Sequence, residues 1–292
     1  MLKRKNKLLL ESADIRPIKH MGQNFLVSEE IIEKIILEAK IKTGETILEV
    51  GPGTGNLTMA LLATGAKVVA IEKDSKLVHL LISNFQFLIS KKKLKVIEQD
   101  ILSFDEMAIK SPYRVIANIP YYLTGKLIQK FLLSANKPSE LILMVQKEVG
   151  ERITAQPPKA NFLSSLVQFL AETKILFKVG KENFWPQPKV DSALIKLTPY
   201  QYTPSIRSYA RDTVGININN NEEFIEFLKM VFRQPRQTLF NNLRKYLVST
   251  SQRSPAHAKL DSVFQELGFD KKIRAQNLGK EDLVNLFSLL GY

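Results

Sequence analysis

The chain has no cysteine and only three histidines, His20, His79 and His257, among its 292 residues. Without cysteine it forms no disulfide, no thiolate metal site and no thiol nucleophile. The absence also excludes the usual covalent route to methylating carbon-5 of a pyrimidine, which needs a cysteine to attack the ring. Because the histidines are scattered along the sequence, a zinc site and a Ser-His-Asp triad are both disfavoured.

Long apolar runs and acidic residues are also scarce. No segment has the apolar length of a membrane span, and the run Leu8-Leu9-Leu10 is too short for a signal-peptide core. We therefore expect a soluble, cytoplasmic protein with no membrane partner. Asp and Glu number 29 against 42 Lys and Arg, which gives a net charge of +13 and a pI near 9.6. That balance favours nucleic acid as the partner, although a generic basic protein or one drawn to anionic membranes would share it.

The length fits two domains. Residues 1–20 carry six basic residues against two acidic ones and predict a mobile basic N-terminal arm. Residues 21–200 alternate strand and helix patterns, which predicts a mostly parallel, doubly wound α/β sheet. Residues 201–292 begin with a linker to about 220 and then show only helical periodicity, so we expect a smaller all-α C-terminal domain.

The predicted strands and helices follow from local patterns. Short apolar runs predict strands over 46–50, 67–71, 94–97, 114–117, 140–145, 175–179 and 192–197. Helical periodicity predicts helices over 28–40, 57–63, 75–89, 124–134, 161–171, 222–233, 235–248, 257–268 and 280–290. Pro235 is expected to start its helix, because proline is tolerated in the first turn and not in the interior.

Three features fall at predicted strand ends, where an open α/β sheet binds its ligand. Gly51-Pro52-Gly53-Thr54-Gly55 allows close backbone approach and opens a helix, Glu72 can accept from ribose hydroxyls, and Asp100 can accept from an adenine amine. NAD is the rival ligand, but its turn is G-x-G-x-x-G, and here the third glycine comes one residue early. Glu49 precedes the turn and suits a cationic aminoacyl tail better than a diphosphate, so we predict S-adenosylmethionine as the cofactor.

The motif Asn118-Ile119-Pro120-Tyr121 predicts methylation of the exocyclic amine of a purine base. That amine is a poor nucleophile, because its lone pair is delocalised into the ring. The side-chain oxygen of Asn118 and the carbonyl of Ile119 can accept its two hydrogens. Pro120 would stiffen the turn, and Tyr121 would stack on the base, as aromatics do with splayed-out nucleotides. Asn118 would also complete the cofactor site.

A basic cluster in the C-terminal region predicts phosphate contacts. Its members are Arg233, Arg236, Arg244 and Lys245. The three arginines can share one helix face, with Leu239, Phe240, Leu243 and Leu247 toward the core. We interpret this face as an RNA-binding surface, supported by the basic arm and the net charge. Solvated surface charges are the alternative.

Five sequence blocks appear in order: Gly22-Gln23-Asn24-Phe25-Leu26, Glu49-Val50-Gly51-Pro52-Gly53-Thr54-Gly55, Asn118-Ile119-Pro120-Tyr121, Gln146-Lys147-Glu148-Val149 and Phe184-Trp185-Pro186-Gln187-Pro188-Lys189-Val190-Asp191-Ser192-Ala193. Together they resemble the KsgA/RsmA family of ribosomal RNA adenine dimethyltransferases. The resemblance spans residues 16–290, nearly the whole chain. It implies the class I fold of S-adenosylmethionine-dependent methyltransferases, with a Rossmann-like sheet.

The resemblance also implies a reaction and further site residues. The expected reaction is N6-dimethylation of two adjacent adenines in the 3′-terminal hairpin of small-subunit ribosomal RNA. Asn24 and Leu26 would contact the cofactor, and Phe184 would be a second aromatic wall for the base, unless it is a core phenylalanine. We expect a monomer that acts on the pre-30S particle, with a role in ribosome biogenesis beside catalysis.

Two other functions fit parts of the sequence. Erm-type methyltransferases of large-subunit RNA share the glycine turn and the N-x-P-Y motif. The block Pro188–Ala193 and the stretch Phe232–Thr238 favour the small-subunit enzyme. A non-catalytic assembly or RNA-binding factor would keep the fold alone. Glu72, Asp100 and Asn118 are all present, which argues against loss of activity.

Overall fold

The computed structural model describes residues 2–17, 22–200, 221–250 and 256–291, so the predicted linker lies almost wholly outside the described residues. The chain divides into two compact units. Unit 1 comprises Met1–Glu151 and Glu172–Pro199, and unit 2 comprises Arg152–Ala171 and Tyr200–Tyr292. Residues 152–171, which the sequence places with the first domain, therefore pack in unit 2.

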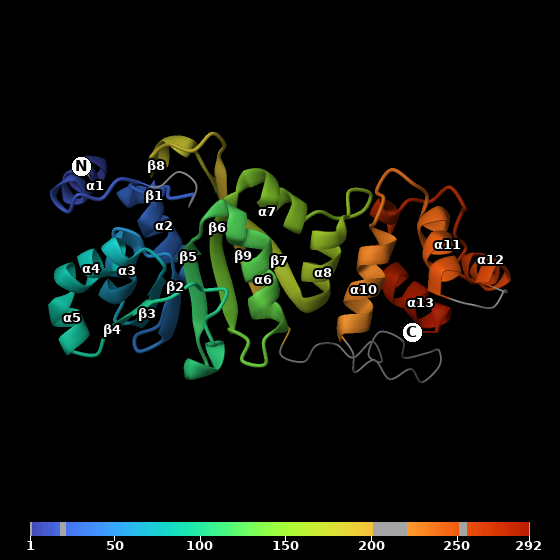
Figure 1. Ribbon diagram of the computed structural model, residues 1–292, viewed down its shortest axis with the longest axis horizontal. Helices are drawn as coiled ribbons and strands as arrows, with labels where there is room; N and C mark the ends of the chain where they lie inside the picture. The colour runs from blue at the N-terminus through green and yellow to red at the C-terminus, as the bar shows by residue number, and fades with distance from the viewer. Residues whose placement is uncertain (1, 18–21, 201–220, 251–255, 292) are drawn as a thin grey trace. The chain divides into compact units, whose positions relative to one another are not determined.

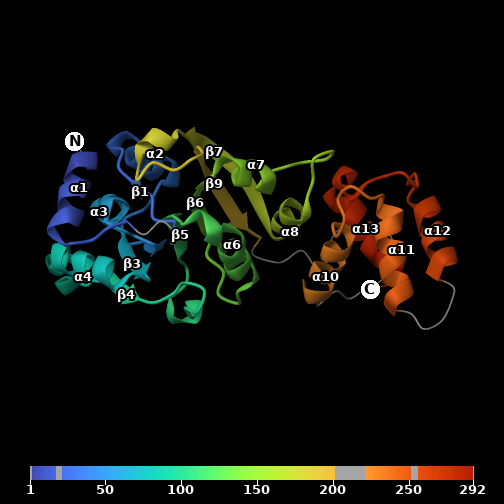
Figure 2. The same ribbon diagram turned by 45° about the horizontal axis from the view of Figure 1, so that its top comes forward.

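Unit 1 is built on a seven-stranded sheet in the order β4-β3-β2-β5-β6-β9-β7. The strands are β2 (Thr46–Val50), β3 (Lys67–Glu72), β4 (Leu94–Glu98), β5 (Arg114–Asn118), β6 (Glu140–Gln146), β7 (Ala171–Val179) and β9 (Ser192–Pro199). Strands β4, β3, β2, β5 and β6 run parallel, and β9 is antiparallel to β6. Helices cover both faces of the sheet (Figures 1 and 2), so the predicted doubly wound α/β fold is confirmed.

The central strands are short apolar runs because both of their faces are covered. Residues 141–145 of β6 are at most 1% exposed. The register sets Val50 opposite Ile71 and Glu72 opposite Glu98, so β2, β3 and β4 end at one edge of the sheet. β5 ends at the same edge with Asn118. This alignment brings side chains that are far apart in the sequence to one place.

The helices of unit 1 match most of the expected ones, with two differences. They are α1 (Leu2–Ser12), α2 (Glu29–Ala39), α3 (Asn56–Ala63), α4 (Ser75–Asn84), α5 (Gln86–Ser90), α6 (Thr124–Leu133) and α7 (Lys147–Ile153), the last of which starts in unit 1. The helix expected over 75–89 is interrupted at Phe85, which is 4% exposed with φ −115° and ψ 18°. Helix α7 was not predicted, since its seven residues follow a strand without a break.

The N-terminal residues expected to form a mobile arm instead form helix α1. Leu10 is fully buried in a cluster with Phe25, Val27 and Leu77, and Asn6 is 1% exposed. The prediction was wrong because it considered the charges alone, while a few apolar residues pack the segment against the domain. Figures 1 and 2 both show α1 beside the short strand β1 (Phe25–Leu26).

Unit 2 is helical, with α8 (Phe162–Leu170), α10 (Asn221–Val231), α11 (Leu239–Thr250), α12 (Ala256–Glu266) and α13 (Lys280–Leu290). Its core includes packed aromatic rings, with Phe224 lying 4.3 Å from Phe169 and 5.2 Å from Phe287 between ring centroids. The helix expected to start at Pro235 begins at Leu239, because the Thr238 hydroxyl accepts from Asn241 N and caps it. Among the described residues, no helix is long and apolar enough to cross a bilayer.

Candidate active site

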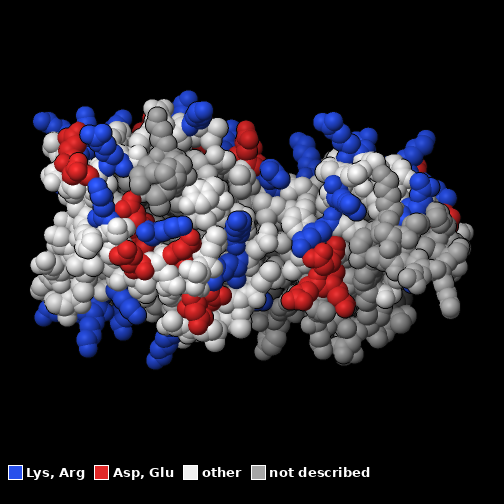
Figure 3. Space-filling view, in the orientation of Figure 1, with Lys and Arg blue, Asp and Glu red and all other residues white. Residues whose placement is uncertain are grey.

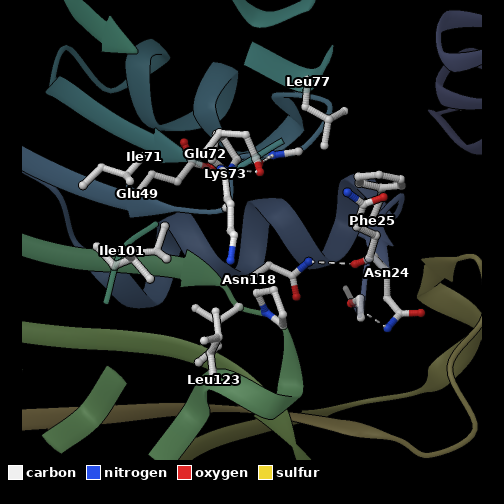
Figure 4. A pocket seen from close by; sticks show the side chains of 18 of the residues that line it. Asn24, Phe25, Glu49, Ile71, Glu72, Lys73, Leu77, Ile101, Asn118 and Leu123 are labelled. Atoms are coloured by element: carbon white, nitrogen blue, oxygen red, sulfur yellow. Dashed lines mark hydrogen bonds between the residues drawn. The ribbon is translucent and has the colours of Figure 1, made fainter. Parts of the chain in front are cut away.

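A cavity of about 960 Å³, a volume that includes open solvent, lies in unit 1 at the carboxyl edge of β2, β3, β4 and β5. Ten of the predicted site residues line it: Asn24, Leu26, Gly51, Gly53, Glu72, Asp100, Asn118, Ile119, Pro120 and Tyr121. Figure 4 shows several of these side chains converging from the strand ends and from the segment before β1. The structure therefore brings together the residues that the sequence separates by almost one hundred positions.

The glycine turn fits tightly under β1. Gly53 has a φ of +59°, and a Cβ built there would lie 2.8 Å from the Phe25 ring. A larger residue would therefore be strained by the backbone and blocked by the ring. Gly55 ends the turn as the N-cap of helix α3 and has a φ of +83°. The turn forms one wall of the cavity and Phe25 another.

Glu72 joins the tip of β3 to the glycine turn. Its carboxylate accepts from Lys73 N at 2.8 Å and Asp74 N at 3.0 Å on Oε1, and from Gly53 N at 3.2 Å on Oε2. Burial raises the pKa of Glu72, and these backbone donors oppose the rise. Its remaining acceptor capacity lies mainly on Oε2, where a ribose hydroxyl can bind.

Glu49 is a buried carboxyl with an open acceptor atom. It is 1% exposed and lines the cavity, and the Thr58 hydroxyl donates to its Oε2 at 2.6 Å. No described residue donates a hydrogen bond to Oε1. Burial raises the pKa of Glu49 to about 8, with a smaller contribution from the charge of Glu72. A cation in the cavity would relieve that cost, because an opposite charge favours the ionised carboxylate.

Asp100 already has a cationic partner in this structure. Lys73 Nζ donates to its Oδ2 at 2.8 Å, and Leu102 N donates to Oδ1 at 2.9 Å. The hydrogen bond from Lys73 is the main reason that the pKa of Asp100 is lowered. Figure 4 shows the Lys73 side chain extending across the cavity. Sequence reasoning missed Lys73, although its place directly after Glu72 at a strand tip could have indicated it.

The Asn118 amide is held in one orientation. Its Nδ2 donates to the backbone carbonyl of Asn24 at 3.0 Å (Figure 4), which leaves Oδ1 at the opposite edge of the amide group. No described residue donates to that Oδ1, so it stays available as an acceptor. The Ile119 side chain is 2% exposed and anchors the turn in the core. The two residues thus place an acceptor at the cavity without a negative charge.

Tyr121 and Phe184 occupy different environments. The half-buried Tyr121 lines the cavity, and its hydroxyl lies 2.8 Å from Ser192 Oγ, a contact that fixes the ring. Burial is the main reason that the pKa of Tyr121 is raised, so it stays neutral at physiological pH. Phe184 is fully buried in the main core and pairs with Leu26 across β1 and β8 (Phe184–Trp185). It is not among the residues that line the cavity, and its core position matches the alternative expectation of a core phenylalanine.

The segment around β1 is fixed by amide side chains that the sequence did not single out. Asn56 Nδ2 donates to Leu26 O at 2.8 Å and to Asn6 Oδ1 at 3.1 Å. Gln23 Nε2 donates to Asp74 Oδ2 at 3.0 Å. These bonds connect α1, α3 and the loop after β3 to β1 and to the segment before it, which carries the Asn24 carbonyl. They are positioning contacts, since none involves the Oδ1 of Asn118.

The predicted RNA-binding arginines do not share a helix face. Arg233 and Arg236 lie in the loop between α10 and α11, and Arg244 lies on α11. Asn242 Nδ2 holds that loop by donating to Val231 O at 3.0 Å. All three arginines are exposed, and none has a carboxylate partner among the described residues. The side chains of Lys245 and Leu247 lie outside those described.

The fold and the cavity define a class. A doubly wound sheet with a glycine turn after β2, a buried acid at the tip of β3 and a second acid after β4 is the architecture of class I S-adenosylmethionine-dependent methyltransferases. The cavity fits that cofactor on its own chemistry. No described residue donates to Glu49 Oε1, which leaves this oxygen to a cationic tail, and the carboxylate ionised by such a tail would repel the diphosphate of NAD.

The chain belongs to the ribosomal RNA adenine dimethylase family, whose model matches residues 17–287. It is 37% identical to the ribosomal RNA small subunit methyltransferase A of Mycoplasmopsis pulmonis, over 94% of this chain and 98% of that protein. A dimethyladenosine transferase from Plasmodium falciparum superposes with a TM-score of 0.69 at 28% identity, covering 89% of this chain and 94% of that one. The 23S rRNA methyltransferase ErmE shares the fold, with a TM-score of 0.66 at 20% identity over 92% and 100% of the two chains.

Proposed function

We propose that the protein dimethylates N6 of two adjacent adenines in the 3′-terminal hairpin of small-subunit ribosomal RNA. Family membership supports adenine in ribosomal RNA as the target, and the relatives named as small-subunit enzymes support the choice of subunit. The observation that carries the proposal is the Asn118 amide, which is held through Nδ2 by Asn24 O and whose Oδ1 receives no hydrogen bond from any described residue. The protein acts in the cytoplasm, as a monomer, on the pre-30S particle.

The cofactor is bound by residues at the strand ends. When bound, S-adenosylmethionine supplies a methyl group activated by its sulfonium. Glu49 holds the cationic tail, Glu72 accepts from the ribose and Asp100 accepts from the adenine amine. Asn24, Leu26 and the glycine turn, through Gly51 and Gly53, complete the walls of the site.

Catalysis rests on positioning, since no strong base is needed. Asn118 Oδ1 and the Ile119 carbonyl accept the two hydrogens of the target amine and aim its nitrogen at the methyl group. The target amine, held by Asn118 and Ile119, would accept the methyl group from the sulfonium, which would leave as a neutral thioether, and the amine would then lose a proton to water. Tyr121 stacks on the base with its ring fixed by Ser192, and Pro120 stiffens the turn between them. An amide at position 118 avoids a further negative charge beside two acidic residues.

Unit 1 is the catalytic domain and unit 2 the RNA-binding domain in this proposal. Arg233, Arg236, Arg244 and Lys245 contact phosphates. The exposure of the three arginines, without a carboxylate partner in the described part of the chain, supports this role. Binding should therefore weaken steeply as salt rises.

A methylation assay distinguishes this proposal from its rivals. Purified protein is incubated with radiolabelled S-adenosylmethionine and unmethylated small or large subunits, and the modified adenines are mapped by reverse-transcription stops. We expect label on two neighbouring adenines of the small subunit only. Label in the large subunit would indicate an Erm-type enzyme, and no label with retained particle binding would indicate an assembly factor. The Asn118→Ala variant is the negative control.

A further inference from the structure

A second basic surface lies at the edge of unit 1 opposite the cavity. It consists of Lys67, Lys91, Lys92, Lys93 and Lys95, here called the lysine edge, and all five are exposed. Residues 75–97 contain no aspartate or glutamate. None of the five lysines has a carboxylate within 4 Å among the described residues. In Figure 3, Lys and Arg side chains project along the border of the molecule below α5 and β4.

These lysines are held next to one another by the sheet. Val68 N donates to Lys93 O at 2.9 Å, so Lys67, the first residue of β3, lies beside Lys93, the residue before β4, at a backbone spacing of about 5 Å. Like charges directly opposite each other on neighbouring strands repel and destabilise the folded state. Lys92 adds a second cost, because its φ of +55° is a conformation that glycine or asparagine adopts more readily. A polyanion on this surface would offset the first cost, because its phosphates neutralise the like charges.

An exposed aromatic ring accompanies the charges. Phe87 on α5 is 68% exposed, and Lys91 Nζ lies 5.7 Å from the centroid of its ring. A cation–π contact occupies one side of a ring and leaves the other open. Aromatic rings beside lysines are the combination that binds unpaired bases together with their phosphates. Edge protection of β4 does not account for the cluster, because only Lys95 lies on the strand.

The lysine edge acts separately from the cavity. β4 runs from Leu94 to Glu98, and Asp100 follows it, so about 16 Å of strand separates Lys93 from the cofactor site. That distance exceeds the screening length of about 8 Å at physiological ionic strength. The lysines therefore change neither the charge of the cavity nor the grip on the target base.

We propose that Phe87 and the lysine edge form a second RNA-binding surface, which takes a segment of ribosomal RNA other than the target hairpin. One unpaired base stacks on Phe87, and the lysines contact the phosphates beside it. The proposal depends on the family's ribosomal RNA substrate and not on which adenines are methylated. Its consequence is recognition of a folded particle: the isolated hairpin occupies the cavity, and only a larger RNA reaches both edges of the sheet.

Binding measurements on full-length variants test the proposal. The variant Lys91→Gln/Lys92→Gln/Lys93→Gln is compared with Lys40→Gln/Lys110→Gln/Lys174→Gln, which removes three exposed lysines from dispersed positions. The dissociation constant is measured for unmethylated small subunits and for the isolated hairpin over a range of KCl concentrations. We expect the first variant to lower the slope of log K against log salt by about 2 to 3 on small subunits only. Phe87→Ala should weaken subunit binding about tenfold, and Phe87→Trp should retain it.

Stability controls keep the test interpretable. Lys92→Gly removes a charge and relieves the backbone, so it should weaken subunit binding without lowering the melting temperature. Equal slopes for the two triple variants would overturn the proposal, and so would equal losses on the hairpin and on the subunit. The surface would be assigned to membranes instead if the wild type bound phosphatidylserine vesicles and the lysine-edge triple variant lost vesicle binding while it kept subunit binding. Methylation of the hairpin, measured in parallel, reports the proposed function independently.

Discussion

We expect the protein to release a proton from Glu49 when the cofactor binds. Replacing Glu49 with glutamine should abolish this release. The folded protein holds Glu49 with a pKa of about 8, against 4.5 for the free side chain, mainly because of burial. At pH 7 about nine in ten molecules therefore carry the proton before binding. A cationic tail needs the ionised form, so binding should release about one proton. Glutamine can still accept from Thr58 but has no proton to release.

Calorimetry in buffers of different ionisation enthalpy measures that proton. We expect a release of about one proton at pH 7 for the wild type and nearly none for Glu49→Gln. Wild-type affinity should rise about tenfold between pH 6 and 7, a range in which an α-amino group with a pKa near 7.7 stays charged. The cofactor affinity of Glu49→Gln should not change over this pH range, so the ratio of wild-type affinity to variant affinity should grow with pH. Adenosine, which lacks the tail, is the control ligand and should release no proton.

The same group should make stability depend on pH. Because the folded pKa is raised, the folded state binds more protons than the unfolded state between pH 4.5 and about 8. The contribution of Glu49 to the free energy of unfolding is fully present below pH 4.5 and is lost as the pH rises through about 8. The increase in the pKa of Glu49 corresponds to at most roughly 5 kcal/mol in the free energy of unfolding. Glu49→Gln should be more stable than the wild type at pH 8.5. Equal pH profiles of unfolding, together with equal proton release, would refute the assignment.

Four further substitutions, at three positions, test the rest of the site. Asn118→Ala should abolish methyl transfer while leaving the melting temperature within a few degrees, and near-normal turnover would contradict the positioning mechanism. Tyr121→Ala should weaken capture of the target base by about 1–3 kcal/mol, the usual contribution of one stacked base. Tyr121→Phe should lose only the contact with Ser192, about 1 kcal/mol. RNA titrations measure both effects. Gly53→Ala should lower cofactor affinity and the free energy of unfolding by about 1–2 kcal/mol or more. The reason is that residue 53 has a φ of +59° and that the added Cβ would contact the Phe25 ring. Unchanged cofactor binding by calorimetry would show that β1 moves away from the added Cβ without cost.

The sheet and its ligand edge could be predicted because the signals are local. Each parallel strand is a short apolar run bounded by polar or glycine residues, and both faces are covered by helices. Parallel strands end at a common edge, so Glu72, Asp100 and Asn118 could be assigned to one site from their places alone. The cofactor class followed from the spacing of the glycines and the acid before them.

The remaining elements lacked such signals. β1 and β8 have two residues each, which is too short for any alternation to show, and they form only because Leu26 and Phe184 meet in the core. Helix α1 was hidden by its charges, although its buried Leu10 joins a cluster built from distant segments. Helix α11 begins later than expected because a threonine cap at 238 prevails over the proline at 235.

The orientation of the Asn118 amide depends on the residues that sequence reasoning handled least well. Its Nδ2 is held by a backbone carbonyl of Asn24, and any residue at that position would supply the same atom. What matters is where the segment lies, and this is set by β1 pairing with β8, by Asn56 donating to Leu26 O and by the Phe25 ring over Gly53. Phe184 is fully buried and pairs with Leu26 of β1, so we expect it to affect the reaction by positioning the segment that holds the amide. Truncating its ring should lower turnover and stability together, whereas truncating Tyr121 should lower base capture alone.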